Sequence, residues 1–491
     1  MDWLGTDGDT RDRPSIGGPV SNADYERLEG SGSLAWSDGP SRRVRLDVRA
    51  GRNERGTPGP YGSDPLQAFS GLDLISRGEN RFSSVNASGQ FRQTARLAHR
   101  LQLSWATYRG HFVAPFGDSD DDTRRVTGRY QLDVESRIPI SAGWEIQDER
   151  ADNTFVTSST FEFLPIDRTV MGWFMEARPT MAGRVFMNLG ARLERIARAP
   201  LDADAFGSRP DLPGDIVWSM NPKVSVAWIA RAGVTGANAP LFGWTKLRMG
   251  AGTGIKPPTT VEIAFSDNPT LKPERSRSVD AGIEQALAGG AAVLDVVWFR
   301  NDYDDLIVFV PRELQERGVS RHTADNVSNA RASGAEVGLT WRPTTALAVR
   351  GGWTWLDTEV LGIDRAPDAA PLPYVVGDRL IRRPAQQGSL AITWTGSRAG
   401  AFLTVNGRGA MLDLEPNLGA GACFGQPAPC HATFDNPAYV TTGIGASLRL
   451  NGAVEVFGRV SNLFNRAYEE ALGFPALGRA GMVGLRVTGR R

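Results

Sequence analysis

The sequence contains no long apolar run, and this absence limits how the chain can meet a membrane. In its 491 residues no stretch approaches the roughly 18 uncharged apolar residues of a membrane helix, because Asp295 interrupts the best candidate. Membrane-spanning strands stay open, since their hydropathy signal is weak and their composition looks soluble. Net charge is also lacking, because 55 basic and 55 acidic side chains cancel. Nucleic-acid binding relies on a basic surface, so we expect no nucleic-acid partner.

The chain also lacks a signal peptide and the side chains of a catalytic site. MDWLGTDGDTRDRPSIGG has no basic region followed by an apolar core, so either the protein stays in the cytosol or its start is missing. GAGTGIKPP lacks the GK[ST] of a phosphate-binding loop. The few histidines are scattered without the spacing of metal ligands: His99, His111, His322 and His431. We therefore expect no enzyme, no cofactor-binding residues and no metal held by histidine.

Cysteine occurs at only two positions, Cys423 and Cys430, in the stretch CFGQPAPC. Glycine and proline make this stretch loop-like, and the spacing could close a small disulfide in an oxidising compartment. Two unpaired thiols are the alternative. A single histidine, His431, accompanies the two cysteines, and this spacing makes a zinc site a poor interpretation.

Residues 278–303, SVDAGIEQALAGGAAVLDVVWFRNDY, show the pattern that dominates the chain. In the first arm Val279 and Ile283 share one parity while Asp280 and Glu284 share the other, which is the period of a half-buried strand. The AGG stretch supplies a turn, and the second arm repeats the alternation less cleanly. The apolar face of this hairpin could meet the core of a soluble sandwich or the lipid around a membrane barrel.

Runs of this kind, bounded by turn residues, predict an all-β chain with about 19 strands and no long amphipathic helix. The ends of each strand are expected within a few residues of the following positions: 27–37, 42–53, 84–94, 98–109, 123–134, 138–150, 167–178, 183–196, 221–231, 243–252, 277–287, 291–302, 331–342, 346–357, 387–396, 399–411, 438–449, 453–462 and 480–488.

The connections between these strands alternate in length. Very short turns such as SDGP, AGGA and NGA alternate with long connections such as 54–83, 197–220, 303–330, 358–386 and 412–437. An up-and-down outer-membrane barrel requires this alternation, whereas Greek-key sandwiches mix their connections. A barrel of this many strands encloses a channel or a plug. Tryptophans within the strands support membrane interfaces: Trp105, Trp144, Trp173, Trp228, Trp244, Trp298, Trp341, Trp353, Trp355 and Trp394.

From GTPGPYGSDP (56–65) onward, several segments resemble the TonB-dependent receptors of the bacterial outer membrane. AGTGIKPPTTVEIAF resembles the family's G-x-G-F-K-x-P-T-x-x-E-x-F, with Ile255 and Pro258 as departures. NPTLKPERS resembles its N-P-x-L-K-P-E-x-S, and the C-terminal stretch its N-L-F-[DN]-x-x-Y…G-x-P-x-x-G. Each match is weak alone, but their order makes the resemblance specific. The matching residues are Asn268, Pro269, Leu271, Lys272, Pro273, Glu274, Ser276, Asn326, Gly334, Glu336, Asn462, Leu463, Phe464, Asn465, Tyr468, Gly473, Pro475 and Gly478.

The resemblance implies an importer in the cell outer membrane, a lipid-embedded barrel of about 22 strands around an N-terminal plug. Such a receptor binds a scarce small chelate such as a ferric siderophore or cobalamin and works with the TonB energy-coupling complex. This sequence shows no plug segment and ends in VGLRVTGRR without a terminal aromatic residue. We therefore expect residues 1–26 to be the stub of a truncated strand plus an extracellular loop. Residues 27–491 would form the barrel, with about 19–20 of the family's strands.

Two other functions stay open: a passive wide pore, and a surface barrel without transport. For ligand contact the long connections offer the aromatic residues Tyr61, Phe116, Tyr374 and Phe424. The acidic run GDSDDDT could supply oxygen ligands to Ca²⁺ or form a solvated extracellular loop, through Asp118, Asp120, Asp121 and Asp122. The AGG turn is expected at the periplasmic rim, with Leu294, Val296 and Trp298 toward lipid and Val297 and Phe299 toward the lumen.

Overall fold

The computed structural model of the chain is built almost entirely from β-strands. It describes residues 2–488 apart from 7–11, 14–17, 116, 159, 205–209, 234–239, 315–318, 364–370, 424–425 and 427–429. Within these ranges, no helix has the length and apolar character needed to cross a membrane.

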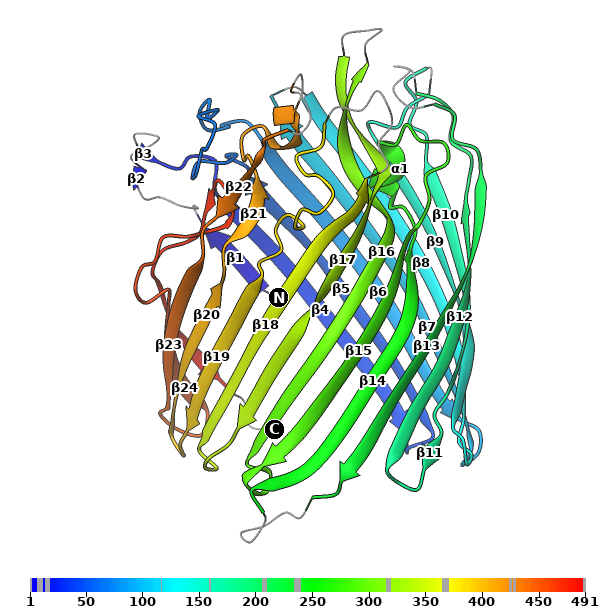
Figure 1. The fold of residues 1–491 in the computed structure, drawn as a ribbon, viewed down its shortest axis with the longest axis vertical. Helices are drawn as coiled ribbons and strands as arrows, with labels where there is room; N and C mark the ends of the chain where they lie inside the picture. The colour runs from blue at the N-terminus through cyan, green and yellow to red at the C-terminus, as the bar shows by residue number, and fades with distance from the viewer. Residues whose placement is uncertain are drawn as a thin grey trace.

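One antiparallel sheet of 21 strands contains most of the described residues. Each long strand pairs with the next one along the chain, from β1–β4 to β24–β27. Figure 1 shows the sheet curled into a barrel of tilted strands. Its strands are β1 (Asp2–Thr6), β4 (Tyr25–Asp38), β5 (Arg42–Gly56), β6 (Arg77–Arg92), β7 (Leu97–Ala114), β8 (Gly117–Val134), β9 (Ile140–Asn153), β10 (Ile166–Ala177), β11 (Thr180–Met181), β12 (Val185–Arg198), β13 (Asp215–Arg231), β14 (Phe242–Lys256), β15 (Glu274–Leu287), β16 (Ala292–Leu314), β17 (Val319–Trp341), β18 (Leu347–Ile363), β19 (Gln386–Thr395), β20 (Ala399–Arg408), β23 (Tyr439–Arg449), β24 (Val454–Ser461) and β27 (Ala480–Val487).

Short elements occupy the connections. Three small pairs of strands are β2 (Asp12–Arg13) with β3 (Gly18–Pro19), β21 (Met411–Leu414) with β22 (Thr433–Asn436), and β25 (Glu469–Ala471) with β26 (Phe474–Pro475). The helical segments are α1 (Thr260–Ala264), η1 (Ala288–Gly290) and η2 (Gly419–Cys423).

The expected all-β, up-and-down architecture is confirmed, and a strand lies at each of the 19 expected positions. Several strand ends lie well beyond the expected positions, including the starts of β6 at Arg77 and β13 at Asp215, and two stretches expected as loops were wrong. The expected loop 303–330 consists largely of the paired ends of β16 and β17, and the acidic run GDSDDDT belongs to β8. In both places the strands continue beyond the alternating part of the sequence.

The hairpin of β15 and β16 shows how the alternation meets the barrel. Ala281 lies directly opposite Trp298 on the outer face, where the tryptophan is 48% exposed. Glu284 lies opposite Asp295 on the inner face, where Asp295 accepts a hydrogen bond from Arg248 at 2.7 Å. The turn between the arms is η1, in which Gly289 has φ of 66°. The apolar face of the hairpin is therefore the outside of the barrel, not the core of a sandwich.

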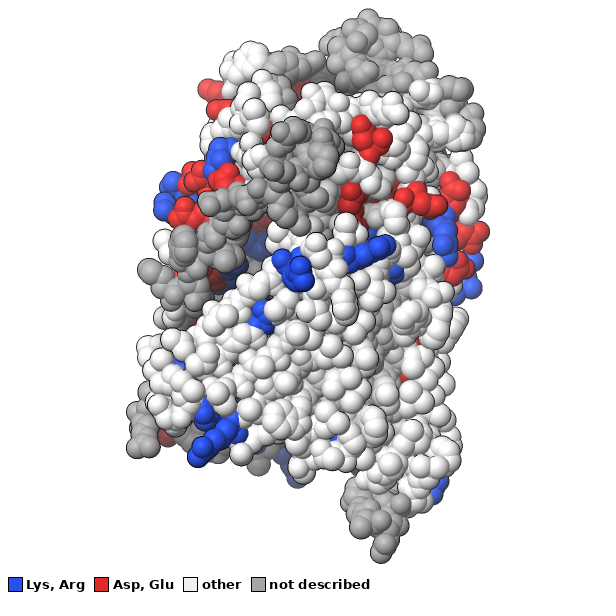
Figure 2. All heavy atoms as spheres, turned by 90° about the vertical axis from the view of Figure 1, so that its left-hand side faces the viewer, with Lys and Arg blue, Asp and Glu red and all other residues white. Residues whose placement is uncertain are grey.

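The outer surface carries an apolar band. Figure 2 shows a wide region almost free of charged side chains, with charged residues above and below it. Of the expected tryptophans, all but Trp244 have strongly exposed rings: Trp105, Trp144, Trp173, Trp228, Trp298, Trp341, Trp353, Trp355 and Trp394. Exposed apolar side chains of this size and number require a nonpolar solvent.

Inward-facing aromatic rings lie against glycines of the neighbouring strand. Phe299 is paired with Gly334, and a Cβ at that glycine would lie 3.0 Å from the Phe299 ring. Gly51 with Phe82, Gly143 with Phe174, Gly445 with Phe402 and Gly484 with Phe457 are paired in the same way. A ring lying over the bare backbone covers the glycine and compensates for its missing side chain. This explains the apolar residue Phe299 on an otherwise polar face.

Contacts between connections join the two ends of the strand order. In the β5–β6 connection the backbone N–H groups of Tyr61 and Gly62 donate to the carbonyl oxygen of Gly473, each at 2.9 Å. The N–H of Ser63 donates to Glu469 at 2.8 Å. Because Gly473 and Glu469 precede β27, these bonds tie β5 and β6 to the last strands of the sheet.

Candidate functional site

The connection between β14 and β15 crosses the concave side of the barrel at its long-loop end (Figure 1). It contains α1, which contacts both β10 and β17, strands that lie on either side of β14 and β15. Thr259 and Glu262 begin this short helix with reciprocal side-chain-to-backbone hydrogen bonds. Lys256 pairs with Glu262 at 3.0 Å and with Glu274 at 3.2 Å. These pairs close the base of the connection, which we call the mouth segment (257–273).

A buried group of charges holds the mouth segment to β10. Arg168 donates a hydrogen bond to the carbonyl oxygen of Pro258 and forms an ion pair with Glu149. Arg125 also pairs with Glu149, at 2.6 Å. Burial disfavours the ionised form of Glu149, but the two guanidinium groups outweigh it and hold its pKa below the ordinary value. The Glu149 carboxylate, which is only 4% exposed, is therefore charged, and the two guanidinium groups balance its charge.

Asparagines of the recognised motifs hold the other end of the mouth segment. Asn268 donates to Asp325 at 2.7 Å. Asn326 accepts from the backbone N–H of Lys272 at 2.7 Å and donates to the carbonyl oxygens of Lys272 and Asp305. These are long-range contacts to the ends of β16 and β17, so the motif residues serve to position this connection.

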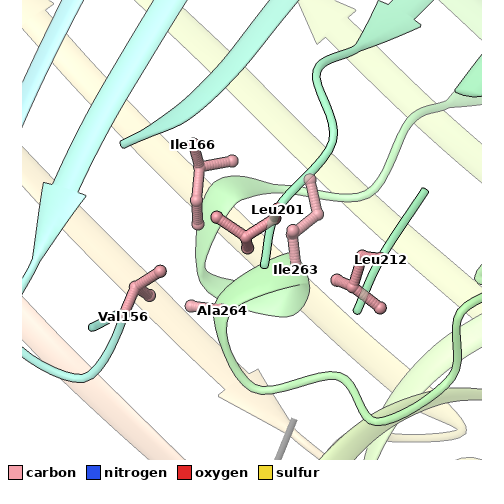
Figure 3. Close-up of a cluster of buried hydrophobic side chains, with 6 residues drawn as sticks. All are labelled: Val156, Ile166, Leu201, Leu212, Ile263 and Ala264. Carbon is pink, nitrogen blue, oxygen red and sulfur yellow. The ribbon is translucent and has the colours of Figure 1, made fainter. Parts of the chain in front are cut away.

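An apolar cluster lies beside α1 (Figure 3). It combines side chains of the helix with those of the connections next to β9, β10, β12 and β13: Val156, Ile166, Leu201, Leu212, Ile263 and Ala264. Ile263 and Leu212 are each 1% exposed. Burial of a side chain of this size contributes about 1.5–3 kcal/mol, enough to keep a five-residue helix in place.

Phe265 of the mouth segment lies next to two further aromatic rings, those of Phe155 and Phe309. The rings of Phe155 and Phe265 are 5.5 Å apart, and those of Phe265 and Phe309 are 6.2 Å apart in an edge-to-face arrangement. They stay 49%, 37% and 45% exposed in the order Phe155, Phe265, Phe309. We call them the aromatic trio. The exposed parts of these rings can contact a planar or apolar ligand.

The inner wall below contains two grooves. One, of about 750 Å³, follows a lane of small residues on β14 and β15, including Gly250, Gly252 and Ser278, and is bordered by Lys223 and Arg248. The other, of about 580 Å³, includes Arg408, Tyr439 and Glu470. Tyr439 donates to Glu470 at 2.6 Å, and its ring is tilted against that of Tyr468, with ring centroids 4.2 Å apart. Both grooves combine apolar surface with charged side chains, Lys223 and Arg248 at the first and Arg408 and Glu470 at the second, which can bind polar groups of a ligand.

The four aromatic residues expected at the ligand site have different positions. Phe116 and Phe424 lie outside the described residues. Tyr374 packs on Val327 and Leu372, and burial raises the pKa of its hydroxyl. Tyr61 belongs to the connection that joins the ends of the sheet. Tyr61 and Tyr374 therefore contact other parts of the protein than the aromatic trio does.

The two cysteines are bonded. Cys423 and Cys430 form a disulfide with Cα atoms 5.5 Å apart, and both side chains are buried with Ala432. The bond closes part of the connection between β21 and β22. This is the arrangement favoured by the spacing.

The acidic run of β8 does not converge on one point. Asp118, Asp120 and Asp122 lie on the outer face of the strand, and Asp121 lies on the inner face. In the ranges that the structure describes, no group of three or more His, Cys, Asp or Glu side chains is arranged to hold a metal ion. Asp120 lies 2.8 Å from His111 and Asp122 lies 2.9 Å from Arg109. The structure thus pairs these carboxylates with cations of β7 instead of with one another.

Sequence reasoning missed the aromatic trio. Phe265 is the last residue of the AGTGIKPPTTVEIAF motif, so the motif was the one feature of the sequence that could have indicated this site. Phe155 and Phe309 come from a loop and a strand end that are far apart in the chain, and only the folded mouth segment brings them together.

A model of the family described as TonB dependent receptor-like, beta-barrel matches residues 3–463. The vitamin B12 transporter BtuB of Vibrio vulnificus (strain YJ016) is 28% identical over 222 residues, which are 45% of this chain and 30% of that protein. The chain thus spans about a third of the length of this curated relative.

Solved structures share the fold. The iron transporter FrpB of Neisseria meningitidis (F3-3 variant) superposes with a TM-score of 0.74 at 12% identity, covering 98% of this chain and 75% of that one. The siderophore receptor PiuA of Acinetobacter baumannii gives 0.73 at 13% identity, covering 95% and 74%.

Proposed function

Because the chain belongs to the TonB-dependent receptor family, as a β-barrel of the bacterial outer membrane, we propose that it imports a scarce chelate such as a ferric siderophore or cobalamin. The observation that carries the proposal is the aromatic trio beside α1, whose partly exposed rings give a ligand arriving from outside an apolar surface. The relatives named above as vitamin B12, iron and siderophore proteins suggest these ligand classes for this chain too. Energy would come from the TonB complex, acting on the plug of the whole receptor.

Uptake by living cells tests this function directly. Cells carrying the full-length gene should accumulate radiolabelled cobalamin or a ⁵⁵Fe-loaded siderophore, and cells lacking the gene should not. A protonophore should abolish this uptake, since transport through TonB depends on the proton-motive force. Uptake that persists with the protonophore would instead identify a passive pore, and equal uptake by both strains of every ligand offered would refute the proposal.

The aromatic trio can be tested in the same cells. Replacing Phe155, Phe265 and Phe309 with alanine removes three exposed rings, each worth about 0.5–1.5 kcal/mol when stacked. Ligand affinity at the cell surface should fall roughly tenfold or more, with the barrel still assembled. The matched control is Phe91→Ala, which removes one exposed ring, 43% accessible, far from α1. Equal affinity in the triple variant and the wild type would remove the trio from the ligand site.

A further inference from the structure

Five arginines lie on the outer face of β5 to β9, just above the apolar band. The register places Arg52 directly opposite Arg81, and Arg81 directly opposite Arg109. On the next two strands Arg124 lies directly opposite Arg150. All five side chains are exposed. Like charges directly opposite each other on antiparallel strands destabilise the sheet, so an arginine row of this kind needs counter-charge.

The protein supplies only part of that counter-charge. Three partly exposed carboxylates each pair with one arginine: Glu79 with Arg81 at 2.7 Å, Asp122 with Arg109 at 2.9 Å and Asp152 with Arg150 at 3.5 Å. Among the described residues, neither Arg52 nor Arg124 forms an ion pair with a carboxylate. Exposed ion pairs contribute about 0–1 kcal/mol, so another anion can replace these partners at little cost.

The surroundings of the arginine row are layered from the membrane outward. Nearest the apolar band are Val48, Trp105 and Val126, which are 44%, 40% and 43% exposed. Above them the hydroxyls of Ser83 and Thr107 lie 2.8 Å apart on the same outer face. The arginines follow within two to four residues, which is about 7–14 Å along a strand. Glu79 and Asp152 lie farther out than the arginines of their own strands, whereas Asp122 lies directly opposite Arg109. One exposed carboxylate, Asp148, lies on the membrane side of the row, directly opposite Val126. The arginine row thus lies at the outer border of the apolar band.

We propose that this arginine row binds the phosphate groups of lipopolysaccharide, the phosphorylated lipid of the outer leaflet, with its acyl chains against Val48, Trp105 and Val126. Guanidinium groups bind phosphate through two parallel hydrogen bonds and keep their charge at any physiological pH. The hydroxyls of Ser83 and Thr107 can donate to the same oxygens. This site depends on the outer-membrane position of the barrel and not on the identity of the imported ligand.

The test compares lipid binding by the wild type with that of the triple variant Arg52→Gln, Arg81→Gln, Arg109→Gln. Each protein is purified in detergent, stripped of lipid and titrated with diphosphorylated rough lipopolysaccharide, with bound lipid counted by native mass spectrometry. An arginine near an anionic lipid contributes a factor of roughly five, so the variant should bind roughly 100-fold more weakly. Phosphatase treatment of the lipid should weaken binding to the wild type by a similar factor.

A matched control has three outward-facing arginines replaced elsewhere: Arg275→Gln, Arg277→Gln, Arg300→Gln. Their register partners are Asp304, Asp302 and Val279, so no arginine faces another arginine there. This control should keep wild-type affinity, and all three proteins should show the gel shift of a folded barrel on unheated samples. Equal loss in both triple variants would mean nonspecific attraction and would overturn the site. Displacement of the lipid by an equal concentration of inorganic phosphate would overturn it as a lipid site.

Discussion

The imidazole of His111 lies 2.8 Å from a carboxylate oxygen of Asp120 on the outer face of the β7–β8 hairpin. This hydrogen bond raises the pKa of His111 above its ordinary value, with Asp118 and Glu79 adding to the effect. A raised pKa in the folded state means that the pair stabilises the protein fully below the ordinary pKa of histidine, about 6.5. That contribution is lost as the pH rises through the raised pKa.

The variant Asp120→Asn tests this pair. The pKa of His111 should fall back toward its ordinary value, because the amide carries no charge. With only four histidines in the chain, ¹³C-labelled imidazole rings can be followed by NMR in detergent across the titration. Asp167→Asn, a change at the start of β10, serves as the control and should leave the titration unchanged. An identical His111 titration in Asp120→Asn and the wild type would contradict the pairing.

Arg168 links the mouth segment to the barrel wall through a buried ion pair and a hydrogen bond. Arg168→Ala leaves Glu149, which is 4% exposed, with Arg125 as its remaining partner and removes the hydrogen bond to Pro258. Breaking a buried ion pair from one side costs about 3 kcal/mol or more. We expect the free energy of unfolding, measured by urea titration in lipid vesicles, to fall by about this amount, and residues 257–273 to become sensitive to protease.

Arg150→Ala is the matched control for Arg168. Its pair with Asp152, at 3.5 Å, is exposed, so the change should alter stability by no more than about 0.5 kcal/mol. If the two variants were equally stable and equally resistant to protease, the buried charges would not hold the mouth segment.

The strands could be predicted from the sequence, because a barrel wall with one apolar and one polar side imposes a period of two. The partners of the ion pairs could not be predicted, because they come from different strands. This alternation predicted each of the 19 strand positions. It failed in the GDSDDDT part of β8, which has no apolar side to reveal it. It also failed at the ends of β16 and β17, where apolar residues follow one another without alternation, as in LIVF (306–309), and Ile307 and Ala324 are buried against Leu271. The helix α1 escaped prediction for a different reason. It is five residues long and depends on Arg168 and Leu212, which come from other connections.

The aromatic–glycine pairs make a prediction about strand β17. A Cβ at Gly334 would lie 2.0 Å from the carbonyl oxygen of Trp355 and 3.0 Å from the Phe299 ring, whereas one at Gly338 would lie 3.8 Å from Asp295. Gly334→Ala should therefore destabilise the barrel by about 1–3 kcal/mol. Gly338→Ala, on the same face of the same strand, should be nearly neutral. Urea unfolding compares them, and equal stabilities would show that the close pairing of Phe299 with Gly334 has no energetic role.

At the scale of the whole barrel, the contacts between connections hold the first and last strands together at the long-loop end. Asp413 is completely buried among them, where it forms an ion pair with Arg382 at 2.6 Å and accepts a hydrogen bond from the N–H of Leu472 at 2.7 Å. Glu469 joins parts of the chain that are far apart in sequence, because its two carboxylate oxygens accept hydrogen bonds from the N–H groups of Ser63 and Gly473. One side chain thus joins connections that lie at opposite ends of the strand order.

Glu469→Ala removes both of these hydrogen bonds and should lower the free energy of unfolding by about 2 kcal/mol, since each is made to a charged acceptor. The loss should appear as a lower temperature at which the fast-migrating folded band converts to the unfolded band in a heating series on SDS gels. Glu455→Ala removes a carboxylate paired with Arg486 at 3.1 Å, within neighbouring strands β24 and β27, and should convert close to the wild-type temperature. Because Glu469, unlike Glu455, connects distant strands, a lower conversion temperature in the Glu469 variant alone would show that the connections help to hold the barrel together. Conversion of both variants at the wild-type temperature would refute this role.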